Sequence, residues 1–253
     1  KNLMERHAYE ESLQRHLWYH QHEPEYGDSY QNIVRIGSAI SDWVELGRRY
    51  PKARQVLLDI RDQDVYALTN GNGYADLFVD VNAINRELQQ DDATYAVFKI
   101  IREKYPQLAG QCYFWIESLL VAKGEYQWCY DHIGGAARFE LIRRTYEMDQ
   151  ANQKRMAEQQ QRTKDMLAEM NRKNGWTNLP PYSPPDTSAM MQKSSQDRFV
   201  GQVRQLIEIL VGTGHIAEAE KIRDQALAVL EDARLKSAVD DARERVRKLS
   251  AQK

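Results

Sequence analysis

Three histidines lie close together near the start of the chain, in the stretch "RHLWYHQHEPEYG" at 15–27. His16 and His20 are four residues apart, so their side chains share one face if the stretch is helical. His22 and Glu23 follow two residues later. Imidazole nitrogens bind zinc, copper or nickel. His16 and His20 are therefore the candidate metal ligands of this sequence.

The same stretch also has a purely structural interpretation, a polar helix end whose Leu17 and Trp18 pack inward. It lacks the HExxH pattern of zinc hydrolases, in which a glutamate directly follows the first histidine. We therefore expect no resident metal and no catalytic residue here, and a metal site remains the alternative.

A glycine-containing loop, "DQDVYALTNGNGYAD" at 62–76, suggests a calcium site. Counted back from Gly73, however, the first ligand position is Leu68 and the twelfth is Val79, neither of which carries an oxygen ligand. A phosphate-binding loop would need a lysine and a preceding strand, which are missing from the stretch. Gly71 and Gly73 are expected to supply a turn between two helices.

The composition limits the classes of function. The 253 residues are 42% hydrophobic and 28% charged, which is typical of a soluble globular protein. A formal net charge of −2 gives no general attraction to nucleic acid or to an anionic membrane. No apolar run approaches the ~18 residues of a membrane span, and the first residues lack the basic-then-apolar pattern of a leader. We expect no cofactor and a cytoplasmic location, with a removed export signal before Lys1 as the alternative.

Two cysteines, Cys112 and Cys129, lie in apolar and aromatic surroundings. Two cysteines do not make a disulfide framework in a domain of this size. We expect buried thiols that act as small hydrophobic groups, and a disulfide between neighbouring helices is the alternative.

Apolar residues recur at helical spacing throughout 30–135, and no alternating strand pattern of useful length occurs. We predict six helices with short connections over this range, and a further helix at about 3–20. Tyr-Pro pairs at 50–51 and 105–106 each separate two helices, because proline fits the first turn of a helix. The predicted fold class is therefore all-α, with 1–150 as a domain of helical pairs.

Neither proline nor glycine interrupts 136–173, which is rich in good helix formers. Apolar positions become rare after Met148, so we predict one long helix whose later part is exposed. A sustained coiled-coil heptad is not expected, because Asn152, Gln159 and Thr163 occupy positions that should be apolar.

Four prolines in 180–185 favour extended chain, and we assign 174–196 to a proline-rich linker. Pro181 and Pro184 form a bare PxxP, which is a weak ligand motif. Helical periodicity resumes in 197–253, predicted as a helical pair with a terminal helix that packs with the first domain.

Within this C-terminal region, "VRQLIEILVGTGHIAEAEKIRDQAL" has the features of two helices joined by a tight turn. The glycines of "GTG" at 212–214 permit the turn. Ala219 and Ala226 allow the two helices to approach closely, and Leu206 is among the larger residues that fill the space between them.

These positions resemble a tetratricopeptide repeat, whose unit is two antiparallel helices of about 34 residues. The resemblance covers 200–235 and a degenerate second copy at 110–135, where Tyr126 takes the place of the favoured aromatic and Cys129 that of the first small residue. It implies an irregular α-solenoid in which neighbouring pairs build one core and leave a concave face.

The resemblance also implies which side chains line that concave face. The expected partner-binding residues are Gln111, Phe114, Ser118, Arg204 and Glu208. Their mixed character suits a recognition groove better than a catalytic pocket.

Three functions follow from these features. The leading hypothesis is a non-enzymatic interaction scaffold that binds a peptide or a partner protein. The alternative is a metal-dependent hydrolytic enzyme that uses His16 and His20. A third is a homodimer formed through the exposed part of the long helix, 145–173.

Overall fold

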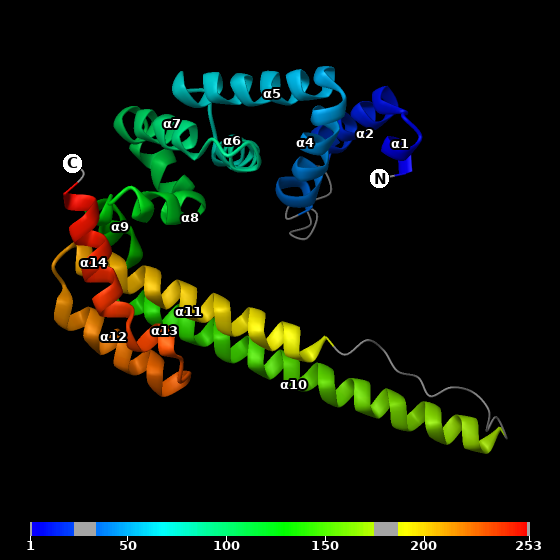
Figure 1. The fold of residues 1–253 in the computed structure, drawn as a ribbon, viewed down its shortest axis with the longest axis vertical. Helices are drawn as coiled ribbons and strands as arrows, with labels where there is room; N and C mark the ends of the chain where they lie inside the picture. Colours follow the sequence, from blue (N-terminus) through cyan, green and yellow to red (C-terminus); the bar gives the residue numbers. More distant parts are fainter. Residues whose placement is uncertain (1, 23–33, 175–186, 252–253) are drawn as a thin grey trace. The chain divides into compact units, whose positions relative to one another are not determined.

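The structure is a computed structural model that describes residues 2–22, 34–174 and 187–251. Every regular element among these residues is a helix and none is a strand, which confirms the all-α prediction. The chain divides into two compact units, Lys1–Leu120 and Val121–Lys253, whose helices are labelled in Figure 1. The sequence placed the end of the first domain at residue 150, whereas the long helix is part of the second unit.

Unit 1 is built from short and medium helices that follow one another closely. They are α1 (Asn2–Glu5), α2 (Tyr9–His22), the π-helix η2 (Arg35–Ala39), α4 (Ile40–Arg49), α5 (Pro51–Thr69), α6 (Ala75–Glu87), α7 (Asp91–Lys104) and α8 (Pro106–Ala122). With α9 of the second unit, α4 to α8 account for the six helices predicted between residues 30 and 135. The single helix predicted at 3–20 is instead broken, because His7 adopts a φ of 57° between α1 and α2.

The two Tyr-Pro pairs end one helix and begin the next, as predicted. Tyr50 is extended (φ −131°, ψ 92°) between α4 and α5, and Tyr105 has a similar φ of −134° between α7 and α8. A proline disfavours the α conformation of the residue before it, which ends the first helix, and its fixed φ suits the start of the second.

The core of unit 1 is centred on Trp43, which is almost completely buried and donates a hydrogen bond from Nε1 to the carbonyl of Ala53 at 3.0 Å. The apolar residues packed around it come from α2, α4, α5 and α6 and are Leu13, Ile40, Leu46, Ala53, Leu57, Ala83 and Ile84. Burial of this group accounts for much of the stability of the unit.

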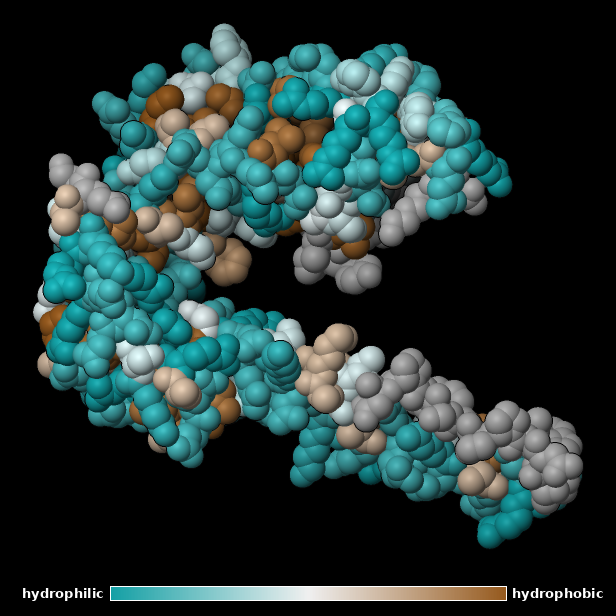
Figure 2. Space-filling view, in the orientation of Figure 1, coloured by the Kyte–Doolittle hydropathy of each residue, from teal (hydrophilic) through white to brown (hydrophobic). Residues whose placement is uncertain are grey.

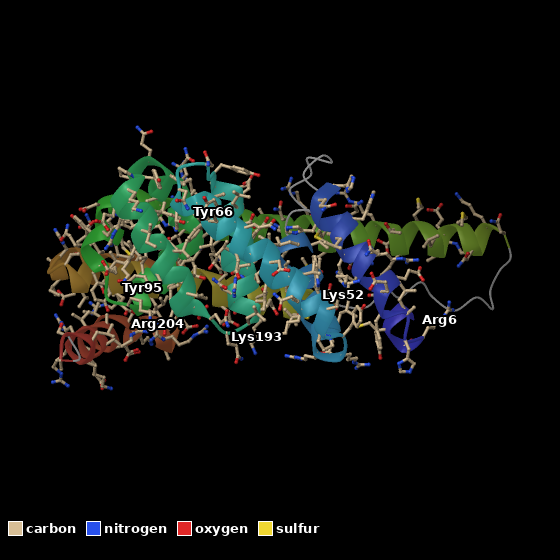
Figure 3. All side chains as sticks on the ribbon, turned by 90° about the horizontal axis from the view of Figure 1, so that it is seen from above. Arg6, Lys52, Tyr66, Tyr95, Lys193 and Arg204 are labelled. Atoms are coloured by element: carbon tan, nitrogen blue, oxygen red, sulfur yellow. The ribbon has the colours of Figure 1, made fainter. Side chains whose placement is uncertain are left out.

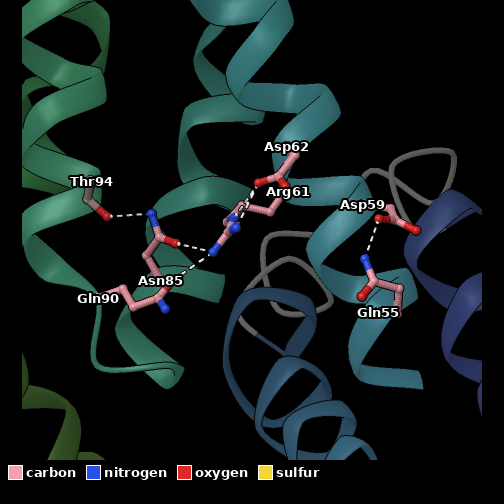
Figure 4. Close-up of polar contacts among 7 residues, drawn as sticks. All are labelled: Gln55, Asp59, Arg61, Asp62, Asn85, Gln90 and Thr94. Atoms are coloured by element: carbon pink, nitrogen blue, oxygen red, sulfur yellow. Dashed lines mark hydrogen bonds and ion pairs between the residues drawn. The ribbon is translucent and has the colours of Figure 1, made fainter. Parts of the chain in front are cut away.

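A polar cluster joins α5, α6 and α7 (Figure 4). Arg61 donates to Gln90 Oε1 at 2.7 Å and to Asn85 Oδ1 at 3.4 Å. Asn85 in turn donates to Thr94 Oγ1 at 3.1 Å, and both of these side chains are fully buried. Because the buried polar atoms are paired, the cluster fixes the three helices without leaving an uncompensated polar group.

Unit 2 contains the long helix and the C-terminal helices. Its elements are α9 (Tyr126–Ile133), α10 (Ala136–Lys173), α11 (Ser188–Gly212), α12 (Ile216–Val229), α13 (Ala233–Lys236) and α14 (Ala238–Ser250). The bounds of α10 are those predicted from sequence. Gly134 and Gly135, with φ of 68° and 54°, separate it from α9.

The predicted linker at 174–196 is too long, because α11 already begins at Ser188. Its first turns pack against α10: Ser195 donates to Asp149 at 3.2 Å, and Gln153 donates to the carbonyl of Met191 at 3.3 Å. These tertiary contacts stabilise a helix in a segment that the sequence assigned to the linker. The PxxP residues Pro181 and Pro184 lie outside the described residues.

A turn at the predicted "GTG" stretch ends one helix and begins the next. α11 and α12 are neighbours joined by a three-residue turn, in which Gly214 has a φ of 82° and His215 donates its N–H to the carbonyl of Leu210 at 2.8 Å (Figure 1). Ala219 and Ala226 are both fully buried. The small residues of α12 therefore face the interior of unit 2.

Candidate partner-binding surface on helix α8

Three of the five predicted partner-binding residues share one exposed face of α8. Gln111, Phe114 and Ser118 are all exposed, at spacings of three and four residues. Cys112 and Ile116, on the opposite face, are buried. The alternation follows from the helical period, which separates the two faces.

The main feature of this face is an aromatic pair. Phe114 is 65% exposed and lies edge-to-face against Trp115, which is 38% exposed, with 5.4 Å between ring centroids. The carbonyl of Trp115 accepts a hydrogen bond from Asn82 of α6 at 3.3 Å, which fixes α8 against α6. Exposed aromatic side chains on a fixed backbone are typical anchors of protein interfaces.

The other two predicted residues do not lie on an open surface. Arg204 binds Asp241 of α14, with 2.9 Å between Nη2 and Oδ2. Glu208 is only 5% exposed, accepts a hydrogen bond from Tyr126 and forms an ion pair with Arg245 of α14 at 3.1 Å. Glu208 is therefore covered by α14 and does not lie on an open face, whereas Arg204 keeps part of its side chain exposed beside Asp241.

The histidine stretch forms aromatic contacts within unit 1. His16 stacks on Trp43 with 5.4 Å between ring centroids, and His20 meets the same indole edge-to-face at 6.1 Å. Nδ1 of His22 lies 2.8 Å from the backbone carbonyl oxygen of Trp18, and the rings of the two residues are stacked. No group of three or more His, Cys, Asp or Glu side chains within the described residues is arranged to hold a metal ion. Glu23 lies outside the described residues.

A cavity of about 380 Å³ lies beside His16 and is lined in part by Ser12, Tyr19, Ser38 and Asp42. Burial lowers the pKa of His16, an effect that the nearby Asp42 carboxylate partly offsets. A neutral imidazole is thus favoured at neutral pH, and it can accept a proton or a hydrogen bond. Sequence reasoning did not predict that Ser38 and Asp42 would join the histidine.

The glycine loop forms the predicted turn. Gly71 has a φ of 87°, and a Cβ at Gly73 would lie 2.6 Å from Leu68 Cα, so only glycine fits there. Leu68 is fully buried and Val79 nearly so, in agreement with the rejection of a calcium loop. Lys104, the last residue of α7, lines a cavity with both glycines, which the sequence did not predict.

Comparison with protein-family models, with curated proteins and with solved structures gives no match for this chain. No helix in the described parts of the chain has the length and apolar character needed to span a bilayer.

Proposed function

We propose that the chain is a non-enzymatic interaction scaffold, built from irregular tetratricopeptide-like helical pairs, that binds a peptide or a partner protein through the exposed face of α8. The single observation that carries the proposal is the exposed Phe114–Trp115 pair, flanked by Gln111 and Ser118. A partner that covers both rings would remove a large apolar area from water.

Two further features support the proposal. The α11–α12 pair has the tight turn and the buried small residues that the repeat family uses. In addition, Asn82 of α6 donates a hydrogen bond to the carbonyl of Trp115, which links α8 to α6 within unit 1.

The experiment uses a photo-reactive benzoylphenylalanine in place of Phe114 in the full chain. The matched control carries it in place of Tyr66 on α5, which is 69% exposed (Figure 3). After irradiation in an extract of the source cells, we expect a protein that cross-links at position 114 and not at position 66. The purified partner should then lose about 30-fold in affinity on Phe114→Ala, as expected for an aromatic anchor, and less than twofold on Tyr66→Ala. Equal affinity for the two variants would contradict the proposal.

The alternative function, a metal-dependent hydrolytic enzyme that uses His16 and His20, has one observation in its favour, the cavity that His16 shares with Ser12 and Asp42. Metal analysis of the purified chain tests it. Stoichiometric zinc that is lost on His16→Ala would favour the enzyme over the scaffold, whereas equal metal content in both proteins would count against it.

A further inference from the structure

The loop between α5 and α6 contains two asparagine–glycine steps, Asn70-Gly71 and Asn72-Gly73. Asparagine is a thermolabile residue, because its side-chain amide is open to attack by the backbone nitrogen of the residue that follows. Glycine makes this attack easiest, since it has no side chain to hinder the nitrogen or to restrict the backbone. Both steps therefore have the chemistry of spontaneous deamidation, and they differ only in their surroundings in the fold.

The side chain of Asn70 is held by the last turn of α5. Its Nδ2 donates a hydrogen bond to the carbonyl of Tyr66 at 2.8 Å and another to Thr69 Oγ1 at 3.4 Å. The amide must leave both partners before its Cγ approaches the nitrogen of Gly71. Release of a hydrogen bond precedes reaction at this position, so the fold slows it.

Asn72 is held through its backbone alone. Its N–H donates to the carbonyl of Ala67 at 3.1 Å, whereas its exposed side chain forms no hydrogen bond with any described residue. The nitrogen of Gly73 likewise donates to no residue that the structure describes. Figure 2 shows mostly hydrophilic residues along the upper edge of unit 1, where α5 lies. The exposed amide of Asn72 is therefore in contact with the water that its conversion requires.

We infer that Asn72 is a site of spontaneous deamidation in the folded chain and that the fold protects Asn70. The Gly73 nitrogen gives its proton to a base in the solvent and bonds to Cγ of Asn72. The bond from Cγ to Nδ2 breaks, and Nδ2 takes up a proton and leaves as ammonia. One water molecule then opens the succinimide ring. Cleavage of the new bond to Cγ gives aspartate, and cleavage at the main-chain carbonyl gives isoaspartate.

Isoaspartate at position 72 changes the path of the backbone, which then runs through the former side chain and is one carbon atom longer. Gly73 lies so close to α5 that an added Cβ would be 2.6 Å from Cα of Leu68, a fully buried residue. The longer backbone must displace Gly73 from this contact, and close packing transmits such a displacement to its neighbours. The isoaspartate form is therefore less stable than the aspartate form, which has the same charge on an unchanged backbone.

Peptide mapping of the full chain by mass spectrometry tests the site. One sample is kept folded at pH 8 and another is kept in guanidinium chloride, and fragment spectra distinguish the two positions. In the folded chain we expect Asn72 to be converted about fivefold faster than Asn70, the effect of roughly one hydrogen bond. In guanidinium chloride that bond is lost, so the two rates should agree within about twofold. Asn72→Ser, which has no side-chain amide, should retain only the slow conversion of Asn70.

The urea midpoint gives the second measurement. The isoaspartate form, separated by chromatography after incubation, should have a lower midpoint than the variant Asn72→Asp, which should match the wild-type chain. Equal rates at Asn70 and Asn72 in the folded chain would overturn the inference, as would a folded chain in which Asn72 is unchanged while the unfolded chain reacts at both positions. An isoaspartate form as stable as Asn72→Asp would overturn the predicted displacement of Gly73.

Discussion

Tyr126 of α9 donates a hydrogen bond from its hydroxyl to Glu208 Oε1 of α11 at 3.1 Å, and its ring lies directly against Gly212 of the same helix. Burial, together with the negative charge of Glu208, raises the pKa of Tyr126, so the hydroxyl remains a donor. The other carboxylate oxygen of Glu208 pairs with Arg245 of α14. One tyrosine thus fixes α9 on α11 at the point where α14 also docks.

Gly212→Ala should destabilise unit 2. A Cβ at this position would lie 2.2 Å from Tyr126 Cγ, so the ring must move and its hydrogen bond to Glu208 is disturbed. Overpacking of this kind costs roughly 1–3 kcal/mol of the free energy of unfolding. The measurement is the urea midpoint of the full chain.

Gly201→Ala on the same helix is the control. A Cβ there meets nothing within 4 Å, and the position is exposed in the helix interior. Alanine should stabilise the helix by about 0.5–1 kcal/mol at such a site. If Gly212→Ala and Gly201→Ala changed the urea midpoint equally, the contact between Tyr126 and Gly212 would contribute nothing to the stability of the folded chain.

Ala226→Leu tests the contact between α11 and α12. Ala226 is fully buried, so three added carbon atoms must displace the groups packed around it. We expect a loss of roughly 1–3 kcal/mol in the free energy of unfolding. Ala217→Leu, an exposed position of the same helix, should change it by less than about 0.5 kcal/mol. An equally small effect at position 226 would contradict the close packing of the pair.

Much of this fold was predictable because local chemistry determines it. Gly134-Gly135 and the absence of proline set the bounds of α10, and Gly214 sets the turn between α11 and α12. The sequence did not predict the start of α11. Contacts to α10, such as the hydrogen bond from Ser195 to Asp149, stabilise helical structure in residues whose composition is typical of a linker.

The candidate site was only partly predictable. Helical spacing correctly placed Phe114 on the exposed face of α8. The same reasoning failed for Glu208, because a periodic pattern shows which side chains share a face but not which other helix covers it. Only the docking of α14, which brings Arg245 to Glu208, distinguishes a covered face from an open one.

Both cysteines should be unreactive in the folded chain. Burial raises the pKa of Cys112 to about 12, and Cys129 is fully buried as well. The thiolate is the reactive form, so at pH 8 a disulfide reagent should modify neither residue in the native state and both in guanidinium chloride. If one equivalent of the reagent reacted rapidly with the native protein, one of these two thiols would be open to solvent.

The last prediction concerns acid stability and Glu10. Tyr50 and Lys52 donate hydrogen bonds to its carboxylate at 2.6 and 2.9 Å, and they lower its pKa from the usual 4.5 to about 2. A carboxylate with a depressed pKa contributes stability above its unfolded pKa and loses it as the pH falls toward the folded value. Glu10→Gln should therefore lower the urea midpoint at pH 7, and the difference from wild type should narrow below about pH 4.5.

Glu11→Gln provides the control on the same helix. Glu11 pairs with Arg15 of the same helix, an exposed contact at 2.8 Å, and with no other helix among the described residues. Its removal should leave the midpoint nearly unchanged at every pH, since exposed pairs of this kind contribute little. If the difference between wild type and Glu10→Gln were the same at pH 7 and pH 3, the Glu10 carboxylate would not link α2 to Tyr50 and Lys52. The attachment of α2 would then depend on its other contacts, such as the burial of Leu13 and the stacking of His16 on Trp43.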